Sequence, residues 1–155
     1  MLKAEKDADA DVLSVRESVQ AVLKGLGYSL IELSVSRHRG SVQIKAVIYN
    51  GKSIGTDDCS KAHRAIMPRL ELTFGQNVYL EVSSPGTDRL IREKSEFAHF
   101  LGRGVRCYRT DITEWTAGIL KSAGEKGIII SKNGEIVELS FDVIAKAKLD
   151  PSQEV

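Results

Sequence analysis

The sequence predicts an α+β protein made of two small domains, an α-β-β-α-β domain followed by an all-β domain. Two observations predict the first domain: apolar residues recur at helical spacing over residues 11–26 and 56–72, and they alternate with polar residues in the segments beside these helices. One observation predicts the second domain: short apolar-rich runs follow one another at regular spacing after residue 104. A chain of 155 residues is long enough for two domains of this size.

The composition is that of an ordinary globular protein, because apolar residues make up 42% and charged residues 28% of the chain. No apolar run approaches the roughly 20 residues that are needed to cross a bilayer. The start of the chain is charged and lacks the apolar core of a secretory signal. We therefore expect a cytoplasmic protein with no membrane partner, and a mobile tail over residues 1–10.

The first domain is expected over residues 11–86. Its first helix takes Asp11 as N-cap and carries one apolar stripe. Two strands, at residues 28–37 and 42–48, then alternate apolar with polar side chains and meet at a polar turn, which predicts a hairpin. A strand at residues 78–83 completes the domain.

The second helix is expected to begin at Thr56, a good N-cap residue, with Asp57 and Asp58 where negative charge favours the helix dipole. Its apolar face continues to about Leu72. Pro68 interrupts this pattern, because proline in a helix interior costs about 3 kcal/mol. We expect a kink or an early end of the helix there.

The segment Ser84-Pro85-Gly86-Thr87 predicts a type II turn, because proline occupies its second position and glycine its third. This turn marks the domain boundary. A linker is expected over residues 87–92, the second domain over 93–151, and a short tail over 152–155.

In the second domain, Ser95 is expected to cap a short helix that buries Phe97, Phe100 and Leu101 and stops at Gly102. The sequence Asn133-Gly134 predicts a two-residue hairpin turn. Strands are expected at residues 105–108, 116–122, 127–131, 136–141 and 144–149. Short strands at this spacing are typical of a small barrel of the SH3 or Sm type.

The chain carries no recognisable catalytic pattern, such as a phosphate-binding loop or a nucleophile elbow. Cys59 and Cys107 lack the paired spacing of zinc ligands, so we interpret both as small buried apolar groups. The histidines are interpreted as surface or helix-face residues; they are His38, His63 and His99. We expect no enzymatic activity, no cofactor and no metal.

Two segments have a second interpretation. The pair Asp57-Asp58 can bind Mg²⁺, but a position at a helix start explains it without a metal. The segment Gly124-Glu125-Lys126-Gly127 fits the GxxG loop of KH domains, which joins two helices. Here it lies between two expected strands, so we predict a hairpin turn.

A basic stretch runs from Arg89 to Arg109 and has a formal charge of +4, although the whole chain has only +1. A local field of this kind can steer a phosphate-rich partner, and Tyr108 and Trp115 lie close by in sequence. The alternative is a solvated charged face, with Trp115 in the core or covering a barrel end. The candidate contacts for nucleic acid are Arg89, Arg92, Lys94, Arg103 and Arg106.

The segment Glu81-Val82-Ser83-Ser84-Pro85-Gly86-Thr87-Asp88-Arg89 resembles the signature E-V-S-S-P-G-L-D-R-P-L of the RimP family of bacterial ribosome maturation factors. Thr87 replaces the usual leucine of that signature, and Leu90 replaces its proline. Four further segments resemble family motifs in the same order, over about residues 11–151; they are Gly27-Tyr28-Ser29-Leu30-Ile31, Thr56-Asp57-Asp58-Cys59, Phe97-Ala98-His99-Phe100-Leu101-Gly102-Arg103 and Ile144-Ala145-Lys146-Ala147-Lys148-Leu149.

The resemblance implies an N-terminal α/β domain, a C-terminal SH3- or Sm-like barrel, and a cytoplasmic monomer. It implies a factor that binds the immature small (30S) ribosomal subunit and assists its maturation without catalysis. The implied partners are 16S rRNA and a ribosomal protein near the decoding centre. The rivals are an Sm-like module that acts on free RNA and, with less support from the residues, an enzyme that acts on RNA.

The signature also suggests an interdomain motif, whose members are Ser84, Pro85, Gly86, Asp88 and Arg89. We expect Asp88 and Arg89 to pair with each other or with backbone, and so to fix the angle between the domains. The alternative is that the two residues simply cap the turn.

Overall fold

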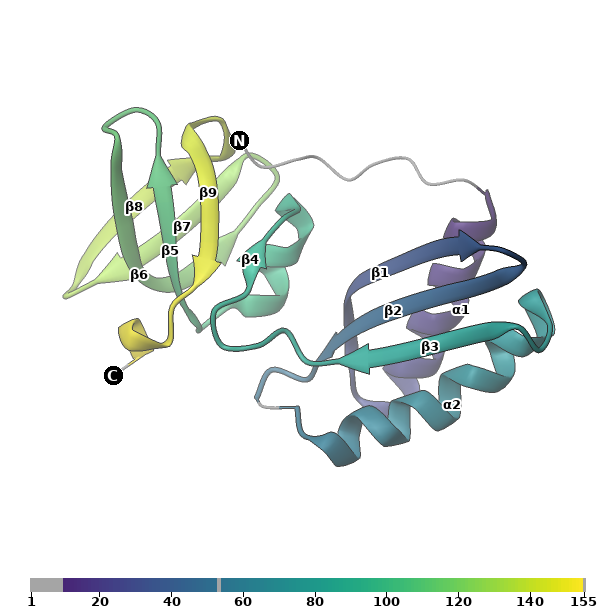
Figure 1. The fold of residues 1–155 in the computed structure, drawn as a ribbon. Helices are drawn as coiled ribbons and strands as arrows, with labels where there is room; N and C mark the ends of the chain where they lie inside the picture. The colour runs from purple at the N-terminus through teal and green to yellow at the C-terminus, as the bar shows by residue number, and fades with distance from the viewer. Residues whose placement is uncertain (1–9, 53, 155) are drawn as a thin grey trace. The chain divides into compact units, whose positions relative to one another are not determined.

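The structure, a computed structural model, describes residues 10–52 and 54–154 (Figure 1). The chain divides into two compact units at the bond between Pro85 and Gly86, and we call them the N-terminal unit and the C-terminal unit. Residues 1–9, which make up most of the expected mobile tail, lie outside the described residues. The first helix begins at Ala10, so Asp11 lies inside it and is not the N-cap.

The N-terminal unit has the predicted order α-β-β-α-β. Its elements are α1 (Ala10–Leu26), β1 (Ser29–His38), β2 (Ser41–Tyr49), α2 (Thr56–Phe74) and β3 (Val78–Ser83). The sheet order is β1-β2-β3, with β1 antiparallel and β3 parallel to β2. Between β1 and β2, Arg39 and Gly40 both have positive φ, at 49° and 83°, which suits a two-residue hairpin turn.

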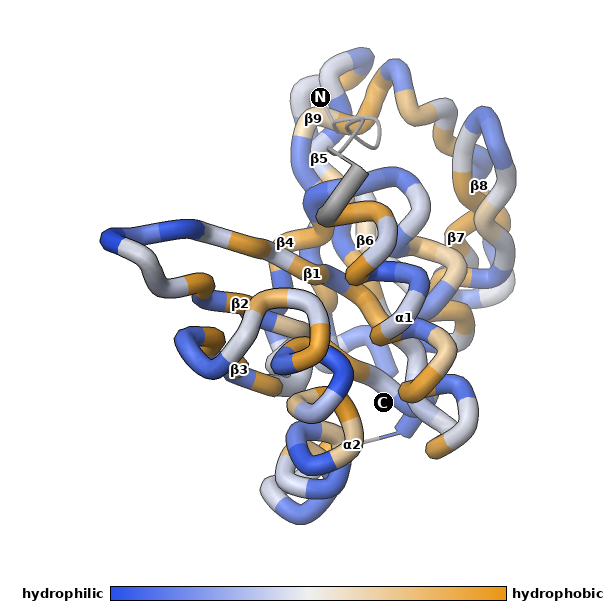
Figure 2. The backbone as a smooth tube through the Cα atoms, turned by 90° about the vertical axis from the view of Figure 1, so that its right-hand side faces the viewer, coloured by the Kyte–Doolittle hydropathy of each residue, from blue (hydrophilic) through white to orange (hydrophobic). Residues whose placement is uncertain are grey.

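Both helices pack on one face of this sheet (Figure 1). Helix α1 buries Val15, Val19 and Leu23 there, and the strands contribute alternate residues such as Ile44 and Val78. In Figure 2, hydrophobic and hydrophilic residues interleave along both helices, as expected when only one side of a helix meets the core. The other face of the sheet carries the polar residues of the strands.

Helix α2 corrects two expectations. Its N-cap is Gly55 and not Thr56, and the Asp58 carboxylate accepts a hydrogen bond from the Gly55 N–H at 2.9 Å. Of the two outcomes expected at Pro68, a kink or an early end, the early end does not occur, because the helix continues to Phe74. Burial of Ile66 and Leu70, on either side of the proline, offsets the lost backbone hydrogen bond.

The C-terminal unit contains one antiparallel sheet. Its strands are β4 (Leu90–Ile91), β5 (Gly104–Arg109), β6 (Glu114–Ala123), β7 (Gly127–Lys132), β8 (Glu135–Ser140) and β9 (Ile144–Leu149). The strand order is β4-β9-β5-β6-β7-β8. Among the described residues no ladder joins β8 to β4, so the hydrogen bonds do not form a closed barrel, and the predicted SH3- or Sm-like closure is not confirmed.

Short 3₁₀ helices complete the C-terminal unit; they are η1 (Lys94–Phe100), η2 (Phe141–Val143) and η3 (Pro151–Glu154). Three elements of this unit differ from the sequence-based expectations; they are η1, β4 and η3. Helix η1 has Glu93 and not Ser95 as its N-cap, and Leu101 follows the helix with 52% exposure. Strand β4 falls within residues 87–92, the expected linker. Helix η3 begins at Pro151, the last residue of the expected second domain, and continues into the expected tail.

The two predicted hairpin turns of the second domain are present. Asn133 and Gly134 have φ values of 52° and 83° between β7 and β8, as a two-residue hairpin requires. The Gly124 N–H donates to the Gly127 carbonyl at 2.9 Å between β6 and β7, so this GxxG segment is a hairpin turn. At the domain boundary, Gly86 has φ 79°, which suits the third position of a type II turn, but residues 84–87 carry no turn assignment.

Candidate nucleic-acid interface

The outward face of β5 and its two neighbours gathers cations and aromatic rings. Along β5, Val105 and Cys107 are fully buried, so Arg106 and Tyr108 between and after them point to the other side. The register places Lys148 of β9 opposite Arg106, and both Lys146 of β9 and Trp115 of β6 opposite Tyr108. Directly paired residues share one face of a sheet. We call this set the basic-aromatic face; its members are Arg106, Tyr108, Trp115, Lys146 and Lys148.

Trp115 lies between a cation and a second ring. The Arg106 guanidinium carbon is 5.1 Å from the Trp115 ring centroid, a cation–π distance. The Tyr108 ring meets the same indole edge-on, with centroids 5.4 Å apart. Trp115 is nevertheless 45% exposed, so it neither fills the core nor lies covered. The arrangement leaves an aromatic surface beside a positive charge, a combination that suits an unstacked base and its phosphate.

The charge on this face is positive. Arg106 and Lys146 are exposed and Lys148 is half-buried. Arg109, at the end of β5, is compensated, because its Nε and an Nη lie 3.0 Å and 2.7 Å from the two carboxylate oxygens of Asp111. That hydrogen-bonded pair raises the pKa of Arg109 and lowers the pKa of Asp111. Arg106 also lies near Asp150, because its charge contributes to the lowered pKa of that carboxyl group.

Arg89 occupies a different environment from the one expected of a phosphate contact. Its side chain is 9% exposed, and its Nε donates to Glu96 Oε1 at 2.8 Å. The other Glu96 oxygen accepts the backbone N–H groups of Arg92 and Glu93, at 3.2 Å and 3.1 Å. Glu96 therefore ties Arg89 to the start of η1.

The other sequence-predicted contacts lie outside the basic-aromatic face. Arg92 is exposed after β4, and the Lys94 Nζ lies 5.4 Å from the centroid of the Phe141 ring. Arg103 Nε lies 3.0 Å from Glu154 Oε2 in η3. Of the predicted set, Arg106 is the member that belongs to the basic-aromatic face.

Lys146 and Lys148 were not among the predicted contacts. The signal in the sequence was the alternation of lysine with apolar residues from Ala145 to Leu149, which places both lysines on the outward side of a strand. Their position beside Arg106 depends on β9 pairing with β5, which the local sequence does not specify.

Two segments of the N-terminal unit that resemble family motifs also meet. The Tyr28 hydroxyl donates to Asp58 Oδ1 at 2.5 Å, so the entry to β1 is bonded to the start of α2. This hydrogen bond is the main cause that raises the pKa of Tyr28 and lowers the pKa of Asp58. Asp58 is thereby used in the fold, and the described residues contain no group of three His, Cys, Asp or Glu side chains that could hold a metal.

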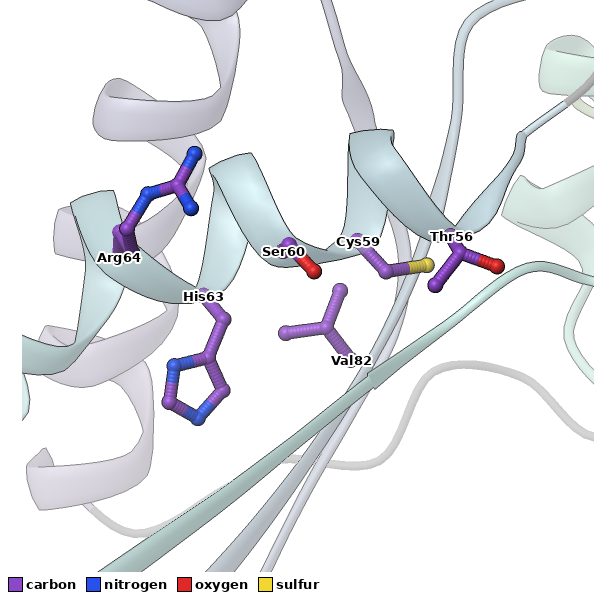
Figure 3. A pocket seen from close by; sticks show the side chains of 6 residues that line it. All are labelled: Thr56, Cys59, Ser60, His63, Arg64 and Val82. Atoms are coloured by element: carbon purple, nitrogen blue, oxygen red, sulfur yellow. The ribbon is translucent and has the colours of Figure 1, made fainter.

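A cavity of about 370 Å³ lies between α2 and β3 (Figure 3), lined by Thr56, Cys59, Ser60, His63, Arg64 and Val82. Figure 3 shows the Cys59 thiol directed toward Thr56 and the His63 ring directed away from it, so the two do not form a thiol–imidazole pair. Burial, with a smaller effect of Asp58, raises the pKa of the Cys59 thiol and keeps it protonated. Cys107 is fully buried, and burial raises its pKa to about 12.

No helix in the described ranges is long and apolar enough to span a bilayer. The sequence profile of the RimP N-terminal domain matches residues 18–88. Among curated proteins, the ribosome maturation factor RimP of Borrelia hermsii (strain HS1 / DAH) is 29% identical over 139 residues, which are 90% of this chain and 96% of that protein. The RimP proteins of Borrelia turicatae (strain 91E135) and Borrelia recurrentis (strain A1) are each 28% identical, with the same coverage.

Proposed function

Because the chain belongs to the RimP family, we propose that it is a ribosome maturation factor that binds the immature small (30S) ribosomal subunit and assists its maturation without catalysis. The observation that supports this function best is coverage: the matched relatives carry that name and align over 90% of the chain, across both units. The factor would act in the cytoplasm as a monomer, with 16S rRNA and a ribosomal protein near the decoding centre as its partners.

The basic-aromatic face is the surface we propose for rRNA. Three cations on adjacent strands suit a run of phosphates, and Trp115 offers a ring on which an unpaired base can stack. Arg92, Lys94 and Arg103 remain candidate contacts in the same unit. We leave Arg89 out of the contact surface because Glu96 already binds its guanidinium.

We also propose that the C-terminal sheet has the strand arrangement of a small SH3- or Sm-like barrel. Strand β9 pairs with β5, which begins the run β5-β6-β7-β8, so the last strand returns beside the first. A single-chain barrel needs that return. The short helix η2 between β8 and β9 would then mark the corner where the sheet turns.

Binding of the protein would favour one arrangement of the rRNA through differential affinity, with no chemical step. The first experiment is sedimentation of the protein with separated 30S, 50S and 70S particles. Co-migration with free 30S particles alone is the expected result. Equal binding to all three, or to none, would contradict the proposed function.

The second experiment tests the face. The variant Lys146→Ala/Lys148→Ala should weaken 30S binding and make it less sensitive to salt. In a plot of the logarithm of the binding constant against the logarithm of the salt concentration, the slope should become shallower by about 0.7–0.9 for each phosphate that a lysine no longer neutralises. The control variant Lys126→Ala/Lys132→Ala removes the same charge from exposed positions outside the face and should leave binding unchanged. Equal effects of the two variants would show that only net charge matters.

The alternative is an Sm-like module that acts on free RNA, and the exposed Trp115 beside Arg106 favours it. Such modules usually assemble into rings. A monomeric mass in size exclusion, together with weak binding of short single-stranded RNA relative to 30S particles, would exclude this alternative.

A further inference from the structure

The polar face of the N-terminal sheet carries side chains in two straight rows. The register aligns Ser36, Gln43 and Tyr79 across β1, β2 and β3 in one row. It aligns Ser34, Lys45 and Glu81 in the next row. All of these side chains are exposed, and together with Ile44 and Leu80 they line a hollow of about 360 Å³.

Tyr79 is an aromatic residue that the core does not use. It is 61% exposed and projects from an edge strand, on the face opposite the helices. Its neighbours on this face are Ser36 and Gln43, which carry a hydroxyl and an amide group, and all three residues line the hollow. An accessible phenol ring on a sheet is a platform on which a nucleobase can stack.

The hollow is not suited to phosphate. Lys45 and Glu81 lie directly opposite each other, so the row that they form has no net charge, and the carboxylate repels an anion. A neutral ligand with its own donors and acceptors fits this pair better. A base stacked on Tyr79 would reach Glu81, because residues two apart on one strand lie roughly 7 Å apart on the same face.

The side chains of Lys45 and Glu81 also distinguish one base from another. An ionised carboxylate only accepts hydrogen bonds, and an ammonium group only donates them. Guanine presents two adjacent donors, N1–H and N2–H, followed by the acceptor O6 on the same edge. Glu81 complements the two donors and Lys45 complements the acceptor. Adenine, cytosine and uracil do not offer this order of groups.

We propose that this hollow is a subsite for one unpaired guanine of single-stranded RNA. Tyr79 stacks on the base, Glu81 accepts from N1–H and N2–H, and Lys45 donates to O6. The site lies in the N-terminal unit and uses none of the residues of the basic-aromatic face, so it does not depend on the proposed function.

The test uses the full chain labelled with ¹⁵N and titrated with guanosine, adenosine, cytidine and uridine 5′-monophosphates. At about 5 mM, in the range where a weak mononucleotide complex forms, the guanosine nucleotide should shift the amide signals of Gln43, Lys45 and Tyr79. The other three nucleotides should shift them far less. Equal shifts with all four, or no shift at these residues, overturn the proposal.

A second measurement gives the affinity ratio. Fluorescein-labelled oligouridine with one central guanine should bind at least about five-fold tighter than the same strand with a central adenine, as expected for a bidentate pairing with the correct base. Glu81→Gln should abolish this preference, whereas Tyr79→Ala should weaken binding and Tyr79→Phe should restore it. The control Glu138→Gln, an exposed carboxylate of the C-terminal unit, should change nothing.

The variant Lys146→Ala/Lys148→Ala separates this proposal from the function proposed above. It should lower affinity for both strands alike and leave the guanine preference intact. Loss of the preference in this variant, or its persistence in Glu81→Gln, would place guanine recognition outside the hollow and overturn the proposal.

Discussion

At the scale of single residues, Arg89 and Glu96 show how a motif that suggests binding can have a structural role. Both side chains are almost fully buried, at 9% and 4% exposure, and a buried charge is stable only with its partner in place. Arg89→Ala should therefore lower the free energy of unfolding of the C-terminal unit by about 3–5 kcal/mol. Urea denaturation followed by Trp115 fluorescence measures this change.

Lys121→Ala is the matched control, because it removes an exposed cation from the same sheet. Its free energy of unfolding should stay within about 0.5 kcal/mol of that of the parent chain. A loss of less than about 1 kcal/mol in Arg89→Ala would return Arg89 to the set of possible contacts.

The bond between Tyr28 and Asp58 predicts a pH dependence in the N-terminal unit. The Tyr28 hydroxyl, and next the Gly55 N–H, lower the pKa of Asp58 below its usual value near 4. A group with a lowered folded-state pKa stabilises the fold above its unfolded pKa, and this stabilisation is lost as the pH falls through the folded pKa. Asp58→Asn should thus be less stable than the parent chain at pH 7 and should approach it below about pH 4.

Tyr28→Phe removes the donor of the same hydrogen bond. Its loss in free energy of unfolding, relative to the parent chain, should therefore become smaller over the same acidic range. Helical circular dichroism during urea unfolding at pH 3, 5 and 7 follows both variants, because both α-helices belong to the N-terminal unit. A deficit that is unchanged at pH 3 would mean that the charge of Asp58 contributes nothing.

At the scale of the elements, the two glycines of the β6–β7 turn make opposite predictions. A Cβ on Gly127 would lie 2.1 Å from the Leu139 carbonyl oxygen of β8, whereas a Cβ on Gly124 meets nothing closer than 3.8 Å. Gly127→Ala should force β7 and β8 apart and cost about 1–3 kcal/mol in unfolding free energy. Gly124→Ala should be nearly neutral, and similar losses in both variants would show that the turn conformation matters and not the close approach.

Periodicity predicted the elements of the N-terminal unit in their order, because each is long enough to show its repeat. Strand β4 has two residues, Leu90 and Ile91, and a pattern of period two cannot appear in so short a run. For α2 the sequence contains two conflicting signals, an apolar face that continues to about Leu72 and a proline at position 68; packing against the sheet decides that the helix continues. Closure of the second sheet depends on contacts between distant strands, which local patterns do not specify.

The basic-aromatic face, too, was only partly predictable from local sequence patterns. The sequence indicated Arg106 and the nearby Trp115, which are close in the chain. It did not reveal that Arg89 is buried, because that follows from the position of Glu96 at the start of η1. The lysines of β9 join the face only through the pairing of β9 with β5.

At the scale of the whole molecule, the two units can be followed separately. The chain has one tryptophan, Trp115, which lies in the C-terminal unit, and both α-helices lie in the N-terminal unit. Gly127→Ala should therefore move the fluorescence midpoint to lower urea and leave the midpoint of the helical signal in place. Midpoints that move together would show that the two units unfold as one.

Strand β9 has a consequence for how the protein is made. The N-terminal unit is complete once Ser83 has been synthesised, whereas the C-terminal sheet inserts its last-made strand between β4 and β5. At about 5–20 residues per second, several seconds of translation separate β4 from β9. During that interval the nascent chain carries a foldable first half and a second half with unpaired strand edges. A ribosome that stalls before residue 144 therefore leaves a product whose exposed strands invite aggregation.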